Sequence, residues 1–201
     1  MLWIDRLDSA LGELTIVTNN THLCALEYEG DSDRMMSFLQ RRYETIEFSA
    51  KTNPLGVTQK LAAYLDGDYG AIEDIPVNPG GTAFQQKVWT ELGRIPLGQT
   101  WTYGELATAL GKPTASRAVG MANSKNPIAI VIPCHRVIGA SKALTGYSGG
   151  LERKRWLLDH EGHSFHQGSS TKRMMRSPVA PISLDPQSAS LSDTHNQLSL
   201  L

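Results

Sequence analysis

The N-terminal part of the chain alternates between short apolar segments and turn-forming residues. The segments LWIDRLD, GELTIVTNN and HLCALEYEG occupy residues 2–8, 12–20 and 22–30. Apolar segments of this length between turns are typical of antiparallel strands. TIEFSA, at residues 45–50, can add one more strand. The pattern therefore predicts a small antiparallel sheet.

Two segments of the same region have helical spacing instead. Apolar residues recur every three or four positions in residues 32–43, where Ser32 is the expected N-cap, and again in residues 57–65. Residues 1–78 are therefore expected to form an α+β unit. The connector of residues 66–81 contains four Gly and two Pro, and it marks the expected domain boundary.

Helical spacing dominates after the connector. Thr82 with Gln85, and Thr102 with Glu105, form two capping-box patterns, in which the two side chains satisfy backbone N–H groups at the start of a helix. Each pattern precedes an apolar stripe. The sequence therefore predicts two helices that begin after these threonines.

A break in the second of these helices suggests a DNA-binding motif. Gly111 and Pro113 should end that helix, and Thr114 is the expected N-cap of a third helix through Ala122. Two short helices around a tight turn predict a helix-turn-helix. The chain as a whole is expected to be an α+β protein with a mainly helical second half.

The C-terminal end divides into a helix and a polar tail. Leu151 to Glu161 is the last expected helix, which Gly162 should terminate, and it closes a unit of residues 79–163. Residues 164–201 are rich in Ser and poor in large apolar residues, so we expect a disordered tail. Its KRMMR segment is either an auxiliary DNA contact or a solvated basic run.

Composition excludes several classes of protein. The longest apolar run, residues 128–133, is far shorter than the roughly 18 residues of a membrane helix, and the N-terminal MLWIDRLDSA carries acids where a signal peptide starts with basic residues. Cys24 and Cys134 form no CxxC pair and no zinc-spaced cluster. We expect no metal, no other cofactor and no membrane partner, and a location in the cytoplasm, or the nucleus of a eukaryote.

Charge is distributed unequally along the chain. Residues 1–78 contain six Lys or Arg and thirteen Asp or Glu, whereas residues 79–201 contain thirteen and seven. Residues 106–151 contain five basic residues and no acid. Such a field favours a polyanion on the second half, because phosphate neutralisation is the sequence-independent part of nucleic-acid binding. A sparsely charged, solvated surface is the alternative interpretation.

The third helix of the second half has an unusual composition for a DNA-reading helix. Its sequence ASRAVGMAN, residues 115–123, is small or apolar apart from Arg117 and a few short polar groups. Small residues let a backbone approach the minor groove, which is about 6 Å wide, and Arg117 can enter the base stack there. Alternatively, the small residues only pack the helix against its neighbours.

The run IAIVIPCHRVIG, residues 128–139, leads an apolar, strand-like segment into Cys134, His135 and Arg136. A catalytic cysteine must lose its proton, and a nearby base can take it. Neighbours on a strand point to opposite faces, so cooperation between Cys134 and His135 requires a turn or a bridging water. Buried cysteines are commonly plain core residues. The glycine-rich TGYSGG and Glu161 further along favour a site.

These motifs together resemble the O6-alkylguanine-DNA alkyltransferases, the methylated-DNA–protein-cysteine methyltransferases. IPCHRVIG, TGYSGG and RKRWLLDHEG occur in the family's order, after a matching helical segment and RAVGMAN. The resemblance is dense over residues 80–163 and looser over the N-terminal unit, which would be the family's RNase H-like domain. It implies DNA repair by stoichiometric transfer of a methyl or longer alkyl group from O6-alkylguanine to a cysteine, and it leaves open whether O4-alkylthymine is a substrate too.

The resemblance also assigns functions to single residues. Cys134 would be the alkyl acceptor, His135 its base through a water, and Glu161 the group that orients the imidazole. Asn126 would organise the active-site turn. Tyr103 would assist nucleotide flipping and contact the base.

The same resemblance implies a monomer that binds double-stranded DNA through the minor groove. The residues expected at the DNA are Arg117, Tyr103, Ala115, Ala118 and Arg136. The residues expected around the flipped base are the Val137 backbone, the lid residues Tyr147 and Ser148, and Lys154, which would help to place Tyr103. Met121 stands where the family often has a small residue, and Ser124-Lys125 where a Gly-containing loop is commoner. These two departures leave the preferred lesion open more than the activity itself.

Three other functions fit parts of the pattern. A non-catalytic alkylated-DNA binding protein would share the fold but would not need Cys134. A cysteine hydrolase would use the cysteine, histidine and glutamate, but it offers no reason for a basic helix-turn-helix. A helix-turn-helix transcription factor would need base-reading side chains that residues 115–123 lack.

Overall fold

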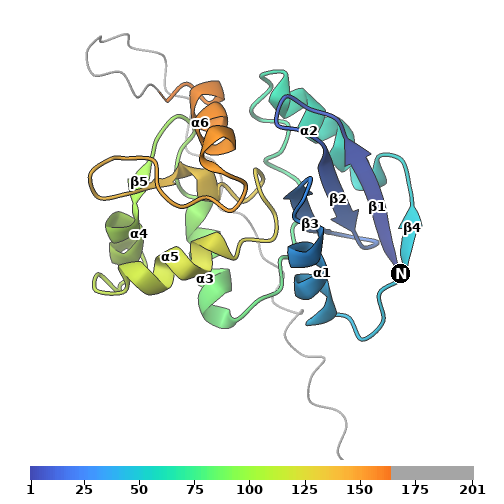
Figure 1. The fold of residues 1–201 in the computed structure, drawn as a ribbon, viewed down its shortest axis with the longest axis horizontal. Coiled ribbons are helices and arrows are strands. Elements are labelled where there is room, and N and C mark those ends of the chain that lie inside the picture. Colours follow the sequence, from blue (N-terminus) through green and yellow to red (C-terminus); the bar gives the residue numbers. More distant parts are fainter. Residues whose placement is uncertain (164–201) are drawn as a thin grey trace, which may run out of the picture.

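Four strands near the N-terminus pair into one sheet in the order β3-β2-β1-β4 (Figure 1). The computed structural model describes residues 1–163. The strands are β1 (Leu2–Leu7), β2 (Leu14–Thr18), β3 (Leu23–Tyr28) and β4 (Phe48–Ala50). β1 pairs antiparallel with β2 and β2 with β3, whereas β4 runs parallel to β1. The predicted antiparallel sheet is present in β1, β2 and β3, and β4 extends it as one parallel strand, because the long connection through α1 returns the chain in the direction of β1.

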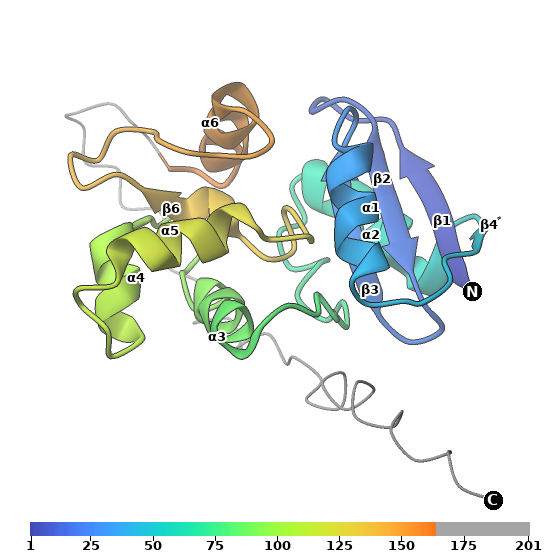
Figure 2. The ribbon, with the colours of Figure 1, turned by 60° about the horizontal axis from the view of Figure 1, so that its bottom comes forward.

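Helices α1 (Ser32–Gln40) and α2 (Val57–Leu65) pack on opposite faces of this sheet (Figure 2). Side chains alternate along a strand, so each face receives its own apolar set. Cys24 and Val17 face α1, while Leu14 and Ile16 face α2. Helix α2 has the predicted bounds and follows a 3-10 turn at Pro54–Gly56. Ser32 is the first residue of α1 and Asp31 is its N-cap, which corrects the predicted cap.

The second half of the described chain is mainly helical, as predicted. Its helices are α3 (Ala83–Leu92), α4 (Tyr103–Ala109), α5 (Ser116–Ser124) and α6 (Leu151–His160). Strand β5 (Trp101–Thr102) pairs parallel with β6 (Val137–Ile138). Both predicted capping boxes are present, at the starts of α3 and α4.

Helices α4 and α5 pack against each other around a short turn (Figure 1). Gly111 in this turn has a φ of 69°, a left-handed conformation that glycine adopts without strain. Thr114 is not the cap of α5: the N-cap is Ala115, and no side chain bonds to the first turn. The predicted third helix therefore exists, but it begins without a side-chain cap.

The edge of the sheet at β3 connects the two halves. All six residues of β3 are buried. The Leu26 N–H donates to the Pro127 carbonyl at 2.9 Å, and the Ala129 N–H donates to the Leu26 carbonyl at 2.9 Å. An edge strand needs such partners for its backbone groups. One hydrophobic core runs from the sheet into the helices, so the segment before Cys134 is anchored on β3.

Some expectations fall outside the described part of the chain. The predicted tail, residues 164–201, and its KRMMR segment lie there. Within residues 1–163, no helix is both long and apolar enough to cross a membrane.

Candidate active site

Cys134 lies in a 3-10 turn, Cys134–Arg136, at the end of a buried loop. The composition of the apolar run before Cys134 suggested a strand. In the structure this run is a loop, because its backbone folds back on itself. The Val131 N–H donates to the Ala129 carbonyl at 2.7 Å, and the Cys134 N–H donates to the Ile132 carbonyl at 2.8 Å. Ile130 has a φ of 67°, a strained conformation for a β-branched residue. The loop is held in this shape by its surroundings.

Asn126 organises this loop with a single amide group. Its Nδ2 donates to the carbonyls of Ile128 at 3.2 Å and Ile132 at 2.8 Å, and its Oδ1 accepts from the Ile128 N–H at 3.0 Å. Nδ2 also lies 3.0 Å from Cys134 Sγ. The Asn126 side chain thus connects both ends of the loop, and the same amide gives the sulfur a hydrogen-bond donor.

The thiol of Cys134 is shielded from water. The residue is 3% exposed. Burial raises the pKa of Cys134, and the hydrogen bond from Asn126 opposes this rise in part. A thiol with a raised pKa is protonated at neutral pH, so reaction requires a group that accepts its proton.

His135 and Glu161 form a buried pair directly beside the cysteine turn. His135 Nε2 lies 3.0 Å from Glu161 Oε1. Because a carboxylate accepts hydrogen bonds, Nε2 carries the proton and Nδ1 is the free base of the ring. Among the described residues Nδ1 has no hydrogen-bond partner, although it is buried. Burial lowers the pKa of His135 more than Glu161 raises it, so the ring is neutral at pH 7.

Glu161 gathers four hydrogen bonds at the C-terminal end of α6. Oε1 accepts from the Tyr64 hydroxyl at 2.8 Å and from Arg136 Nη2 at 2.8 Å, in addition to His135. Oε2 accepts from Arg136 Nε at 2.8 Å. Burial by itself raises the pKa of Glu161, but the charge of Arg136 and the hydrogen bonds from His135 and Arg136 outweigh it and hold that pKa well below its usual range. The carboxylate is therefore ionised.

Arg136 belongs to this buried network and not to the surface. It is 8% exposed, and its Nη1 donates to the Ile95 carbonyl at 2.7 Å. A guanidinium held on two sides in this way is not presented to a phosphate. The structure does not support the DNA contact that the sequence suggested for Arg136.

Lys154 connects the segment after the cysteine to the loop before α6. It is fully buried, and its Nζ donates to the carbonyls of Val137 at 2.5 Å and Thr145 at 2.7 Å. Burial lowers the pKa of Lys154 to about 8. The Tyr103 hydroxyl donates to the Gly146 carbonyl at 3.4 Å. Lys154 is thus joined to Tyr103 only through the loop, which refines the expected placement of Tyr103 by this lysine.

The two predicted lid residues differ in their surroundings. Tyr147 is half-buried and its hydroxyl lies 2.8 Å from the hydroxyl of Tyr28, whereas Ser148 is exposed. Tyr28 comes from β3, far away in the sequence. Tyr64, Arg34 and Glu27 were also missed by sequence reasoning, because no motif marks them.

Arg34 is the most connected of the missed residues. Its Nη1 lies 2.8 Å from Glu27 Oε2, and its Nη2 donates to the carbonyls of Ser124 at 3.0 Å and Asn126 at 2.8 Å. An arginine of α1 therefore fixes the end of α5 and the residue that contacts Cys134. The one possible signal for the ion pair of Arg34 with Glu27 is the burial of the Glu27 carboxylate, and the sequence does not show that burial.

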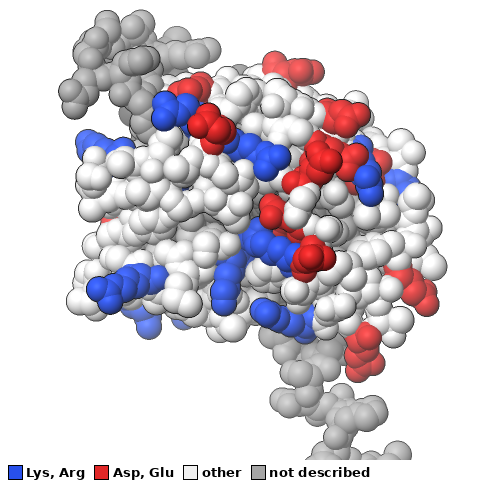
Figure 3. All heavy atoms as spheres, viewed as in Figure 1, with Lys and Arg blue, Asp and Glu red and all other residues white. Residues whose placement is uncertain are grey.

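The outer side of α5 is small and lightly charged. Arg117 and Ala118 are exposed, Ala115 is half-buried, and Met121 is 62% exposed. Val119 and Ala122 face the core. Both interpretations of the small residues therefore remain possible on this helix. One side packs against the core, and the other side is an exposed surface without bulky side chains that a DNA groove can approach. In Figure 3, acidic residues gather mainly over the N-terminal half on the right, and basic residues over the left and middle.

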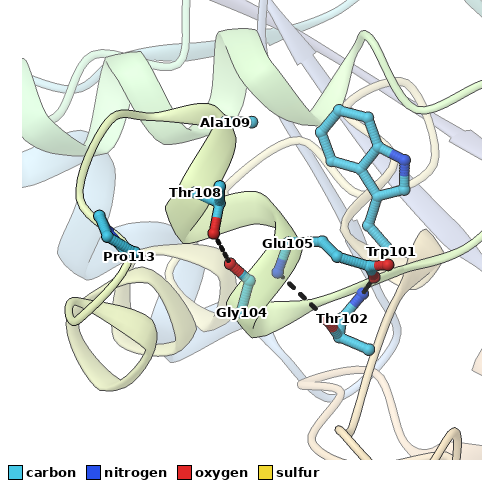
Figure 4. Close-up of a pocket in the computed structure, with 7 residues that line it drawn as sticks. All are labelled: Trp101, Thr102, Gly104, Glu105, Thr108, Ala109 and Pro113. Carbon is cyan, nitrogen blue, oxygen red and sulfur yellow. Dashed lines mark hydrogen bonds between the residues drawn. The ribbon is translucent and has the colours of Figure 1, made fainter.

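A surface hollow of about 660 Å³ lies over β5 and α4, and it contains none of the predicted catalytic residues (Figure 4). Its polar groups are already paired: the Glu105 N–H donates to Thr102 Oγ1, and Thr108 Oγ1 donates to the Gly104 carbonyl. Among residues 1–163, no group of three or more His, Cys, Asp or Glu is placed to hold a metal ion.

Known proteins similar to this chain share both its sequence and its fold. Two family models match: the 6-O-methylguanine DNA methyltransferase DNA binding domain over residues 83–163, and the ribonuclease-like domain over residues 5–79. The methylated-DNA–protein-cysteine methyltransferase of Shigella flexneri is 46% identical over 162 residues, covering 79% of this chain and 95% of that protein. The protein of that name from Mycobacterium tuberculosis H37Rv is 42% identical over 164 residues, covering 80% and 93%.

Solved structures agree with the sequence comparison. The crystal structure of Mycobacterium tuberculosis OGT in complex with DNA has a TM-score of 0.66 and 39% identity, and the match covers 79% of this chain and 92% of that one. An O6-methylguanine-DNA methyltransferase from Pyrococcus kodakaraensis has a TM-score of 0.54 and 26% identity, covering 81% and 99%. The α+β fold predicted from the sequence is confirmed. The chain belongs to the family of methylated-DNA–protein-cysteine methyltransferases.

Proposed function

We propose that Cys134 is the residue that accepts the alkyl group in the reaction of this family, which repairs DNA by methyl transfer to a protein cysteine. The substrate would be O6-alkylguanine, with O4-alkylthymine as a second substrate. The observation that carries the proposal is a buried thiol 3.0 Å from the Asn126 amide, in the same turn as a histidine paired with an ionised glutamate. A core cysteine would need neither partner.

The transfer can be written with these groups alone. The thiol proton passes through a water to Nδ1 of His135, and Glu161 stabilises the imidazolium that forms. The sulfur of Cys134 attacks the alkyl carbon, so an S–C bond forms while the C–O bond breaks. The electron pair of the C–O bond stays on the purine, which takes a proton from water and remains in the DNA as guanine, while His135 gives the proton that it accepted back to water. The carbonyl of Val137, which accepts one bond from Lys154, keeps a second lone pair for the guanine amino group.

A single turnover follows from the position of the other thiol. The product is a thioether, and its cleavage would require a second nucleophile. Cys24 is 2% exposed and packs with α1 on the opposite face of the sheet, apart from the core that contains Cys134. No resolving thiol is therefore within reach among the described residues, and one protein molecule would repair one lesion.

DNA is the proposed partner, and α5 is the proposed contact in its minor groove. The support is a surface of small residues around Ala115 and Ala118, with the exposed Arg117 as the side chain that replaces the flipped nucleotide. Tyr103 would assist the flip, and Tyr147 and Ser148 would cover the base. We further propose a monomer that works in the cytoplasm, with units at residues 1–78 and 79–163.

Arg117→Ala is expected to impair repair of duplex DNA more than reaction with free O6-benzylguanine. The free base needs no flipping, whereas extrusion from a duplex costs a few kcal/mol that an inserted side chain helps to offset. Single-turnover rate constants with both substrates give the comparison, and Lys112→Ala serves as a control for the loss of one exposed charge. Equal losses on both substrates would rule out a flipping role.

The rate of transfer should depend on pH through His135. Because burial lowers the pKa of His135, the ring is a competent base at neutral pH and loses this ability only when it is protonated, below the ordinary value of 6.5. We expect a constant rate from pH 8 to 7 and a decline that starts below pH 6.5, measured by single-turnover kinetics. A midpoint above 6.5 would argue against a buried neutral histidine as the base.

The proposed acceptor is tested directly by mass. DNA that carries isotopically labelled O6-methylguanine is incubated with the full chain, and peptides are analysed by mass spectrometry. We expect one labelled methyl group on the Cys134 peptide and one lesion removed per protein molecule. No addition would favour the non-catalytic binding protein, and more than one lesion removed per molecule would favour a turnover enzyme such as a hydrolase.

A further inference from the structure

A tyrosine of the sheet holds the loop that lies beside the cysteine. Tyr28, the last residue of β3, is 2% exposed. Its hydroxyl lies 2.8 Å from that of Tyr147, and the two rings meet edge to face with their centroids 6.2 Å apart. Neither hydroxyl has another hydrogen-bond partner within residues 1–163. Each phenol therefore depends on the other for its only hydrogen bond there.

The backbone of the same loop is seated on Tyr28. A Cβ atom at Gly149 would lie 2.5 Å from the Tyr28 ring, so only glycine permits this approach. The Arg153 guanidinium lies 4.6 Å from the centre of the Tyr28 ring and donates to the carbonyls of Leu11 at 2.8 Å and Gly149 at 3.1 Å. The N-terminal half thus fixes the position of the loop from two sides.

Three phenols from distant parts of the chain share one hydrophobic core with the thiol. Tyr28, Tyr103 and Tyr147 all pack in the hydrophobic core that contains Cys134. The pKa of each is raised, by burial first and by the charge of a Cys134 thiolate among the other causes. Each phenol is therefore close enough to the sulfur to interact with its charge, and Tyr28 and Tyr147 are the pair that a hydrogen bond holds together.

We propose that Tyr28 is a positioning residue that limits the size of the alkyl group accepted by Cys134, because it holds Tyr147 in place. This inference rests on the proposed function of Cys134. A bulky group would enter only if the Tyr147 ring moved, and this movement would break the bond to Tyr28 and leave the buried Tyr28 hydroxyl unpaired. A methyl group would leave the pair intact.

The test compares two lesions in otherwise identical duplexes, one with O6-methylguanine and one with O6-benzylguanine. Tyr28→Phe and Tyr147→Phe each remove the bond while keeping the ring. In either variant we expect the ratio of the methyl to the benzyl rate constant to fall about fivefold, the effect of one net hydrogen bond. The double variant should show no further change, because both substitutions remove the same interaction. Tyr43→Phe, which alters a hydroxyl beside Cys24 on the other face of the sheet, is the matched control and should keep the wild-type ratio.

Two results would overturn the inference. One is a wild-type ratio in both single variants. The other is an equal loss on both lesions, which is what a merely structural tyrosine would give. If the wild-type protein itself adds no alkyl group to Cys134, the proposed function fails instead, so the two failures are separate. Thermal unfolding of each variant shows whether the fold is kept.

Discussion

Cys134→Ala is expected to abolish alkyl transfer while duplex DNA is still bound. The substitution removes the only nucleophile in the proposed reaction, and removal of a covalent nucleophile lowers rate constants by about 10⁴-fold or more. The proposed DNA-contacting surface, on α5, does not include the thiol, so the dissociation constant for a duplex with the lesion should change little. Lesion removal in a single-turnover assay and DNA binding by fluorescence anisotropy measure the two effects separately.

Cys24→Ala is the matched control for this prediction. Both cysteines are buried free thiols, but Cys24 packs against α1 on the face of the sheet away from Cys134. The control variant should repair DNA at the wild-type rate, although it loses a little stability. Residual transfer in Cys134→Ala, or a loss of transfer in Cys24→Ala, would contradict the assignment of the acceptor.

Glu161→Gln is expected to cause the largest loss of stability among conservative substitutions at the site. The amide keeps the size of the side chain but removes the charge that faces Arg136 and His135, so the Arg136 guanidinium is left buried without its counter-ion. Breaking a buried ion pair in this way costs about 3–5 kcal/mol. Urea unfolding at pH 7 measures the loss in the free energy of unfolding, and the rate of alkyl transfer should fall with it, since His135 loses the carboxylate that orients it.

The control is Glu91→Gln, which alters a similar pair near the surface. Glu91 lies 3.0 Å from Arg94; Glu91 is buried, but the Arg94 side chain is 55% exposed, so solvent hydrates the guanidinium when the pair is broken. Exposed pairs contribute about 1 kcal/mol or less. Similar losses in the two variants would show that the network around Glu161 does not have the expected strength.

The contribution of Glu161 to the free energy of unfolding should also depend on pH. Its pKa in the folded protein is held well below the ordinary value of 4.5. A carboxyl group with a lowered pKa stabilises the folded state above its unfolded pKa, and this stabilisation disappears as the pH falls toward the folded value. The difference in the free energy of unfolding between wild type and Glu161→Gln should therefore be constant at pH 6 to 8 and shrink progressively below about pH 4.5. If the difference in the free energy of unfolding grew as the pH fell, the pKa of Glu161 would be raised in the folded protein and not lowered.

Local sequence patterns predicted the elements whose signals are themselves local. The two capping boxes of α3 and α4 formed as expected, because each needs only a threonine and a Glu or Gln three residues later. Helix α2 has its predicted bounds because its apolar stripe is also a local signal. Thr114 and Ser32 were wrong as caps, because a lone hydroxyl residue near a helix start does not decide where the backbone turns.

The site was predictable where a motif marks it. The motif around Cys134 pointed to the cysteine, the histidine and Asn126, and the family pattern extends to the distant Glu161; the structure brings these four side chains together, and their functions stay predictions. The strand-like run before Cys134 misled the prediction of its conformation, since periodicity does not distinguish a buried loop from a buried strand. Arg136 carries a charge, which suggested DNA; its burial against Glu161 depends on the packing of α6.

The sequence by itself determined the family, the α+β class and most of the helices, and it predicted the nucleophile, because these depend on residue identity and on spacing over a few positions. Only the tertiary structure decided what surrounds the thiol. It brought Arg34 to the Asn126 carbonyl, Tyr64 to Glu161 and Tyr28 to Tyr147. These contacts join residues about 90 to 120 positions apart, and hydrogen bonds over such separations form only when the packing of the core has already placed their partners.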